Sequence, residues 1–110
     1  MQWLKLSEHK QTPIYRGSLV RFSASYPFEA EVVMMVCDSH LGKGRLGLIT
    51  ISGNKAGFNC FSTFPEHARN ADGSITAGMI YDNWATWIDS EWSPDSAWIL
   101  QKGLRVEDLK

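Results

Sequence analysis

The chain has 110 residues, of which 44% are hydrophobic and 12% aromatic, so we expect one domain over residues 1–110 that buries its own core. Its 11 basic and 12 acidic side chains give a formal net charge of −1, which argues against a nucleic-acid partner, since such proteins usually carry a basic excess. We find no apolar run of the length of a signal peptide or a membrane span, and we therefore expect a cytoplasmic protein with no membrane partner.

The first half of the chain predicts β structure. Residues 18–24 alternate apolar and polar side chains, and residues 31–37 form a continuous apolar run rich in valine. Such a run favours a central strand that is covered on both faces. Further strands are expected at 46–52 and 58–64, after turns that contain glycine. Short connections predict an antiparallel meander, because parallel strands need longer crossovers.

The clearest helical pattern covers residues 76–89. Apolar side chains recur at the three- and four-residue spacings of one helical face: Ala77, Ile80, Trp84, Trp87 and Ile88. The residues that fall on the opposite face, toward water, are Asp82, Thr86 and Asp89. Either Ser74 or Thr76 is expected to cap this helix by accepting a hydrogen bond from its first turn.

These elements predict an α+β fold. A last strand is expected at 97–101, after the proline-containing stretch 93–95 that ends the helical pattern. The tail after residue 101 either adds a short strand or frays. The predicted architecture is an antiparallel sheet of four to six strands, arranged mainly as a meander, with one amphipathic helix packed on one face.

Four of the five tryptophans lie between residues 81 and 100. Trp84 and Trp87 share the apolar helical stripe, so both rings are expected in the core. Trp98 is expected there too, because apolar residues flank it in the predicted last strand. Trp92 lies between the two elements, and two interpretations stay open. Its ring either folds back as a lid on the core or stays outside as an anchor for a partner.

The chain carries no motif of a known catalytic or metal site. We therefore predict no catalytic residue, no metal and no cofactor. Cys37 and Cys60 form neither a CxxC motif nor a zinc set, and in a cytosolic chain they are expected as buried free thiols. The glycine-containing stretch 42–47 is not followed by a helix that would bind a phosphate, so we interpret it as a turn. One enzymatic alternative remains: Glu66 and His67, ahead of Arg69, would perform acid–base chemistry on a phosphodiester.

A pattern over residues 53–100 identifies a family. It consists of the turn GNKAG, the segment FPEHAR at 64–69, the helix positions Asn83, Trp84 and Trp87, and a strand that ends in WIL. In this order and spacing the chain resembles the immunity protein 45 family, small bacterial proteins that protect a cell against a toxin. The sequence departs from the pattern at Gly78, since glycine is a poor residue for a helix interior.

The resemblance implies a function in a polymorphic, contact-dependent or type VI secretion toxin system. The protein would be a stoichiometric inhibitor of a cognate toxin domain, not an enzyme, and would act as a monomer or weak homodimer. The main alternative is a general protein-interaction module, either phage-encoded or a subunit of a larger assembly. The resemblance carries no binding residue over to this chain.

Charge adds a candidate binding surface. Many toxins of this type are nucleases with basic active-site surfaces, which acidic groups would complement. The chain has no Lys or Arg between residues 70 and 101, and four acidic residues surround Trp92. The candidate toxin-binding residues are Asp82, Asp89, Glu91, Trp92, Asp95 and, in the long loop 65–75, Glu66. The alternative interpretation of these carboxylates is an ordinary solvated helix face.

Overall fold

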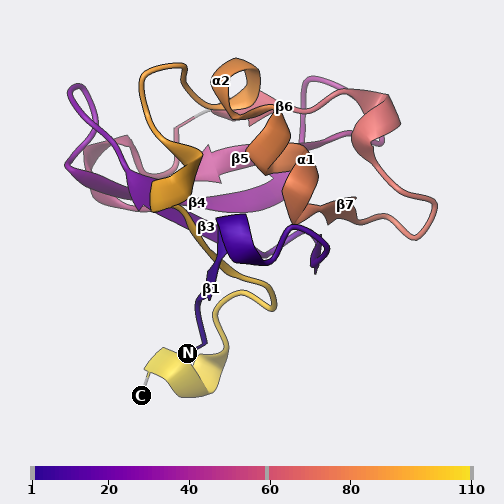
Figure 1. Ribbon diagram of the computed structural model, residues 1–110, viewed down its shortest axis with the longest axis horizontal. Helices are drawn as coiled ribbons and strands as arrows, with labels where there is room; N and C mark the ends of the chain where they lie inside the picture. Colours follow the sequence, from indigo (N-terminus) through magenta and orange to yellow (C-terminus); the bar gives the residue numbers. More distant parts are fainter. Residues whose placement is uncertain (1, 59, 110) are drawn as a thin grey trace.

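The computed structural model describes residues 2–58 and 60–109. Within these residues, the chain forms strands and short helices, with most of the strands in its first half and both α-helices in its second (Figure 1). The strands are β1 (Leu4–Lys5), β2 (Pro13–Ile14), β3 (Leu19–Ser23), β4 (Glu31–Asp38), β5 (Leu46–Thr50), β6 (Ser62–Thr63), β7 (Ile75–Thr76) and β8 (Trp98–Leu100). The α-helices are α1 (Ala77–Asp82) and α2 (Trp84–Trp87). The 3-10 helices are η1 (Leu6–Glu8), η2 (Gly53–Lys55), η3 (Glu66–Ala68), η4 (Pro94–Ser96) and η5 (Val106–Leu109).

The predicted α+β class and antiparallel sheet are confirmed. In the described part of the chain, six strands form the main sheet in the order β1-β8-β3-β4-β5-β6, and every neighbouring pair is antiparallel. β3 to β6 are the predicted meander. The chain then returns at its C-terminal end, where β8 inserts between β1 and β3. β2 and β7 pair in a separate, smaller antiparallel sheet.

β4 is a central strand, as the apolar run predicts. Its alternate residues Val32, Met34 and Val36 are fully buried under the helices. The residues between them, Val33, Met35 and Cys37, are only half-buried. The prediction that both faces of this strand are covered is therefore only partly right. One face carries the core and the other is partly open to solvent.

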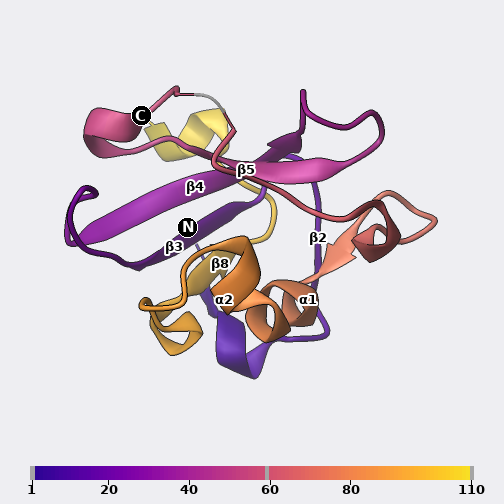
Figure 2. The same cartoon turned by 90° about the horizontal axis from the view of Figure 1, so that it is seen from above.

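The helices cover one face of the sheet, but the single helix expected at 76–89 is wrong. The segment forms α1 and α2, which are separated at Asn83 (φ −109°, ψ 17°) and lie side by side over the strands (Figure 2). The Asn83 side chain explains the break: its Nδ2 donates to the carbonyl oxygen of Met79 at 2.8 Å, and its backbone N–H donates to the same oxygen at 3.1 Å. A short amide side chain thus competes with the backbone for a helical carbonyl group.

The N-terminus of α1 is capped by backbone atoms, so the expectation of a side-chain cap was wrong. Thr76 occupies the N-cap position without a side-chain hydrogen bond, and the Ser74 hydroxyl donates to Asp72 Oδ1 at 2.6 Å. Instead, the N–H of Ala77 donates to the carbonyl oxygen of Thr12 at 2.8 Å. A segment distant in sequence therefore satisfies a free donor of the first helical turn.

Gly78 permits this close approach. Its N–H donates to the carbonyl oxygen of Lys10 at 2.8 Å, and a Cβ at this position would lie 3.0 Å from the same oxygen. The departure at Gly78 from good helix-forming residues is thus explained by packing. The missing side chain lets the segment before β2 lie directly on α1.

The helical tryptophans are core residues, as predicted. Trp84 and Trp87 are 3% and 7% exposed. The Trp84 ring meets Phe22 of β3 edge-on at 5.0 Å, and the Trp87 ring stacks on Phe64 at 4.6 Å between centroids. At roughly 25 cal/mol per Å² and about 200 Å² for each buried indole, each ring contributes about 5 kcal/mol of apolar burial.

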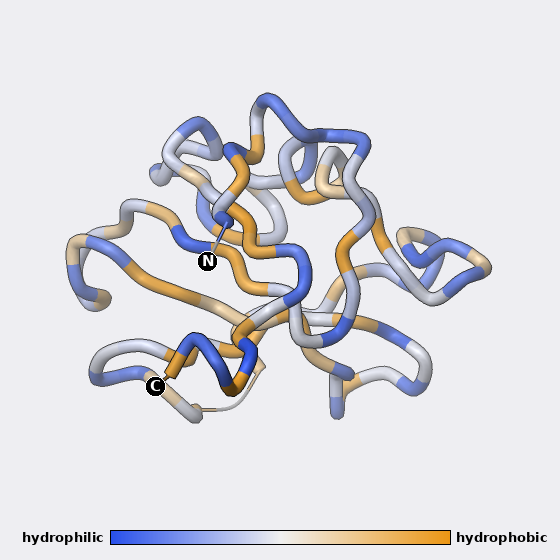
Figure 3. The backbone as a smooth tube through the Cα atoms, turned by 90° about the horizontal axis from the view of Figure 1, so that it is seen from below, coloured by the Kyte–Doolittle hydropathy of each residue, from blue (hydrophilic) through white to orange (hydrophobic). Residues whose placement is uncertain are grey.

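Figure 3 shows the apolar stretches in the strands that cross the middle of the molecule and hydrophilic ones in the connecting loops.

The prediction that Trp98 is buried was wrong. Trp98 is 37% exposed, whereas its neighbours Ala97 and Ile99 are fully buried. Successive side chains of a strand point to opposite faces, so only alternate residues of β8 reach the core. Trp98 pairs with Lys5 of β1 and Arg21 of β3, which shows that it belongs to the face of the sheet away from the helices.

The strand expected at 58–64 is shorter than predicted. In the structure only Ser62–Thr63 pair as β6, and residue 59 lies outside the described residues. After β8 the chain turns and forms the 3-10 helix η5, which lies across the sheet from α1 and α2 (Figure 1). None of the helices in residues 2–58 and 60–109 is long and apolar enough to span a bilayer.

Candidate functional site

The first part of the candidate surface is a contact between α1 and η4. The hydroxyl of Tyr81 donates to Asp95 Oδ1 at 2.7 Å. This hydrogen bond is the main cause that raises the pKa of Tyr81 above its ordinary value, and desolvation and the charges of Asp95 and Asp82 add to it. The phenol therefore remains a donor at neutral pH and fixes one carboxylate oxygen of Asp95.

A lysine from the N-terminal region meets the same surface. Lys10 Nζ lies 3.9 Å above the centroid of the Tyr81 ring and 3.9 Å from Asp82 Oδ1. The side chain of Asp82 is still 69% exposed. The segment between residues 70 and 101 has no Lys or Arg of its own, but the fold places a basic side chain from the N-terminal region beside it. Lys10 offsets part of the charge of Asp82, and no local sequence pattern indicated this contact.

The second part of the surface is the turn after α2. Asp89 Oδ1 accepts a hydrogen bond from the N–H of Glu91 at 2.7 Å, which closes the turn and leaves the Glu91 side chain exposed. η4 follows, and the hydroxyl oxygen of Ser93 accepts from the N–H of Asp95 at 3.1 Å. We call Asp82, Asp89, Glu91 and Asp95 the acidic rim. Asp82, Glu91 and Asp95 are exposed and Asp89 is half-buried.

Trp92 folds back onto the core, which is the first of the two interpretations left open by the sequence. Its Nε1 donates to the Ser25 hydroxyl at 2.9 Å. Its ring lies 5.8 Å from Phe22 and 5.5 Å from Phe28, between centroids. The residue remains half-buried, so part of the indole stays open to solvent, directly after the exposed Glu91 in the chain. Trp92 therefore fixes the rim to the sheet.

Glu66 is separated from the acidic rim. It is exposed in η3, which lies on the other side of α2 from η4 in both Figure 1 and Figure 2. The structure thus brings Asp82, Asp95 and Trp92 into one region with the turn at 89–91. It does not bring Glu66 there.

The arrangement around Glu66 gives no support to the enzymatic alternative. His67 is exposed beside Glu66, but the Arg69 guanidinium is already used by the fold. Arg69 Nε donates to the carbonyl oxygen of Gly73 at 3.0 Å, and its Nη1 donates to that of Gly44 at 2.8 Å. Arg69 therefore holds two turns together. Across the part of the chain that the structure describes, no group of three or more His, Cys, Asp or Glu side chains could hold a metal ion.

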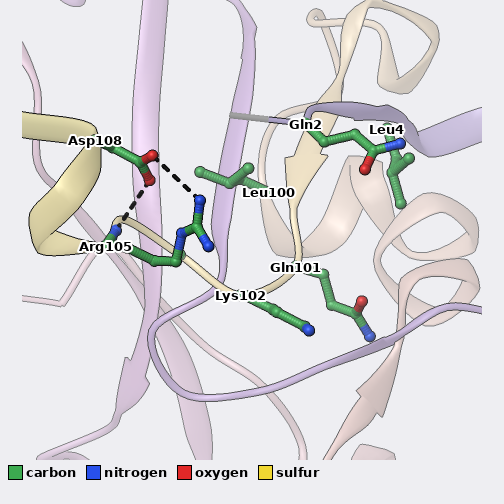
Figure 4. Close-up of a pocket in the computed structure, with 8 residues that line it drawn as sticks. Gln2, Leu4, Leu100, Gln101, Lys102, Arg105 and Asp108 are labelled. Atoms are coloured by element: carbon green, nitrogen blue, oxygen red, sulfur yellow. Dashed lines mark hydrogen bonds and ion pairs between the residues drawn. The ribbon is translucent and has the colours of Figure 1, made fainter.

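A pocket of about 370 Å³ lies away from the acidic rim, between the N-terminal segment and the tail (Figure 4). Its lining residues are Gln2, Leu4, Leu100, Gln101, Lys102, Gly103, Arg105 and Asp108. The backbone N–H of Arg105 donates to Asp108 Oδ2 at 3.2 Å and its Nη2 lies 3.6 Å from Oδ1. These contacts hold the pKa of Asp108 below its ordinary value, and the backbone hydrogen bond from Arg105 is the largest cause. Arg105 is thus already paired inside the pocket.

Comparison with known proteins gives one match. The family model of immunity protein 45 matches residues 6–99 of the 110-residue chain, a range that includes both α-helices and the whole acidic rim. No curated protein and no solved structure matches the chain. Since the family model covers most of the sequence, the chain belongs to the immunity protein 45 family.

Proposed function

We propose that this protein neutralises a cognate bacterial toxin by binding to the toxin domain as a stoichiometric inhibitor. Membership of an immunity protein family supports a toxin-neutralising role, and such families are generally not enzymes. The proposal names the acidic rim, with the exposed part of Trp92, as the surface that meets the toxin. The toxin would offer a complementary basic surface.

The observation that carries this proposal is the rigid mounting of the rim carboxylates. Asp95 is fixed by the Tyr81 hydroxyl, and Asp89 is fixed by the N–H of Glu91. Side chains that are already ordered lose less conformational entropy on binding, so a rim of this kind favours affinity. Charges at the edge of an interface also accelerate association with an oppositely charged partner.

The helical layer provides the scaffold for this surface. Trp84 and Trp87 are used inside the fold, so the polar side of the same segment is free for contact. Trp92 adds apolar area next to the carboxylates. This matters because aromatic residues near the centre of an interface often dominate its binding energy. A partly exposed indole within an acidic surface therefore suits a basic protein partner.

A titration tests the proposed function. The toxin encoded beside this protein's gene is purified and its activity is measured against increasing amounts of the protein. We expect activity to fall in proportion and to vanish at equimolar protein, because each copy occupies one toxin domain. Co-expression with the same toxin should restore growth.

Two results would contradict the proposal. Full toxin activity in the presence of excess protein would exclude inhibition by binding. Protection by an amount of protein far below that of the toxin would indicate catalytic turnover. A His67→Ala variant distinguishes catalysis from binding. If this variant folds but no longer protects, the result would support the enzymatic alternative at Glu66 and His67.

A further inference from the structure

Cys37 and Cys60 come together although they lie 23 residues apart in the sequence. Their Sγ atoms are 3.9 Å apart, and both residues are half-buried free thiols. Neither belongs to the acidic rim or to the aromatic contacts that hold the helices. The pair therefore has a separate position in the fold and is open enough for a small reagent to reach.

The sheet itself holds the two sulfur atoms together. Cys37 of β4 stands directly opposite Gly47 of β5. Because Gly47 has no side chain, Cys60 Sγ fills the space above it, and a Cβ at Gly47 would lie 2.8 Å from that sulfur. Opposite residues of an antiparallel pair place their Cβ atoms about 5 Å apart. The Cys60 sulfur is thus held within side-chain reach of Cys37.

The remaining distance is small for a disulfide bond. Bonded sulfur atoms are about 2 Å apart, so the two sulfurs must approach each other by about 2 Å. Rotation of the two side chains provides movement of this size without a change in strand pairing. Cys60 Sγ now lies 3.1 Å from the carbonyl oxygen of Ser62 and 3.3 Å from that of Leu48, and the Thr63 hydroxyl donates to it at 4.0 Å. Hydrogen bonds to sulfur are weak, so oxidation would give up little in these contacts.

We propose that Cys37 and Cys60 form a dithiol site that low-molecular-weight disulfides, such as glutathione disulfide, oxidise reversibly to an intramolecular disulfide. This inference goes beyond the proposed toxin inhibition and does not depend on it. The bond would tie the middle of the main sheet to the segment that leads into β6.

The exchange takes place in two steps. Cys60 sulfur attacks one sulfur of glutathione disulfide, which breaks that S–S bond and releases one glutathione with the proton from Cys60. Cys37 sulfur then attacks Cys60 sulfur, and the second glutathione leaves with the proton from Cys37. Two protein thiols are oxidised by two electrons in total, and one glutathione disulfide is reduced to two glutathione thiols.

The order of the steps follows from the surroundings of Cys37. Burial first, and then the neighbouring Cys60, raise the pKa of Cys37 to about 12. Its thiol remains protonated at neutral pH and is a poor first nucleophile, because the thiolate is the attacking form. Once Cys60 carries glutathione, its thiol no longer raises the pKa of Cys37. The Cys37 sulfur also lies beside the mixed disulfide, so the second step is intramolecular and tolerates a smaller thiolate fraction than the first.

The folded protein with its native sequence provides the main test. It is incubated with glutathione disulfide at neutral pH, the remaining thiols are alkylated, and the intact mass is measured. We expect a product lighter by two hydrogen atoms, without glutathione or alkyl groups, that dithiothreitol converts back to the dithiol. A stable glutathione adduct, or two thiols that remain free, would overturn the proposal.

Two matched serine variants test the order of attack. Cys37→Ser should accumulate a mixed disulfide with glutathione on Cys60, because the resolving thiol is missing. Cys60→Ser should remain largely unmodified under the same conditions. Equal rates of glutathione addition to both variants would contradict the assigned order, and the native protein tests the disulfide itself even if a variant does not fold.

Discussion

Trp84 and Trp98 belong to the same aromatic stretch but have different environments. Trp84 is 3% exposed and packs edge-on against Phe22, whereas Trp98 is 37% exposed on the opposite face of the sheet. The sequence distinguishes them less well than the structure, because each belongs to a segment in which apolar residues recur. The helical spacing placed Trp84 correctly. For Trp98, the alternation of strand residues was the informative signal, with Ala97 and Ile99 as the buried pair.

This difference predicts a difference in stability. Trp84→Ala should lower the free energy of unfolding by about 3–5 kcal/mol, because it leaves a large cavity between helix and sheet. Trp98→Ala is the matched control and should cost less than half as much, since part of its ring already meets water. Urea denaturation measures both values. Equal losses in the two variants would show that Trp84 does not hold the helical layer on the sheet.

A second prediction at the residue scale concerns Tyr81. Its hydrogen bond to Asp95 raises the pKa of the phenol, so Tyr81 should ionise above the ordinary pH range of a tyrosine. Asp95→Ala should return that titration toward the ordinary range, because the carboxylate acceptor and its charge are both lost.

The titration is followed by the absorbance of tyrosinate. Asp89→Ala removes a rim carboxylate that is not among the causes of the Tyr81 shift, and it is the control. The raised pKa of Tyr81 also makes the stability of the fold depend on pH. The stabilisation that the Tyr81 hydrogen bond provides is complete below the ordinary tyrosine pKa and is lost as the pH rises through the raised pKa. A titration that is identical in the native protein and Asp95→Ala would contradict the contact.

At the scale of elements, most strands could be predicted and their connections to the helices could not. The strands at 18–24, 31–37 and 46–52 are present with ends that differ by one or two residues, because alternation and apolar runs are local signals. The break at Asn83 and the backbone cap of α1 depend on tertiary contacts. The three- and four-residue spacing of apolar side chains continues across Asn83 unchanged, so the sequence pattern does not reveal the break.

Gly78 gives a test of these tertiary contacts. Replacement of glycine by alanine inside a helix usually stabilises it by up to about 1 kcal/mol. Here the new Cβ would lie 3.0 Å from the carbonyl oxygen of Lys10 and 3.3 Å from its Cβ. We expect Gly78→Ala to lower the free energy of unfolding by about 1 kcal/mol instead, because the segment before β2 must move.

A matched substitution in α2 provides the reference value. Ala85 is exposed, so Ala85→Gly reports the intrinsic helix preference in the same layer without a tertiary contact. It should cost roughly 0.5–1 kcal/mol. Thermal or urea unfolding compares the two variants. A clear gain in stability from Gly78→Ala would show that Lys10 does not pack closely on α1.

At the scale of the whole molecule, charge could be predicted only in part. The segment between residues 70 and 101 is free of basic residues, and the fold places its carboxylates along α1, the turn after α2 and η4. Distant parts of the chain then alter this surface. Lys10 approaches Asp82, and Glu66 lies across the helical layer from η4. Local composition does not show either effect, because both arise from contacts between separate elements.

The dissociation constant of the toxin complex tests the central proposal most directly. Asp82→Lys combined with Glu91→Lys reverses two exposed rim charges with little effect on the hydrogen bonds that hold the rim. The control, Glu66→Lys combined with Glu107→Lys, changes the net charge equally at exposed positions outside the rim. We predict that the rim variant binds the cognate toxin at least about tenfold more weakly, mainly through slower association, and that the control binds almost as the native protein does. Equal affinity of the rim variant and the native protein, or an equal loss in the control, would contradict the assignment of the acidic rim as the toxin-binding surface.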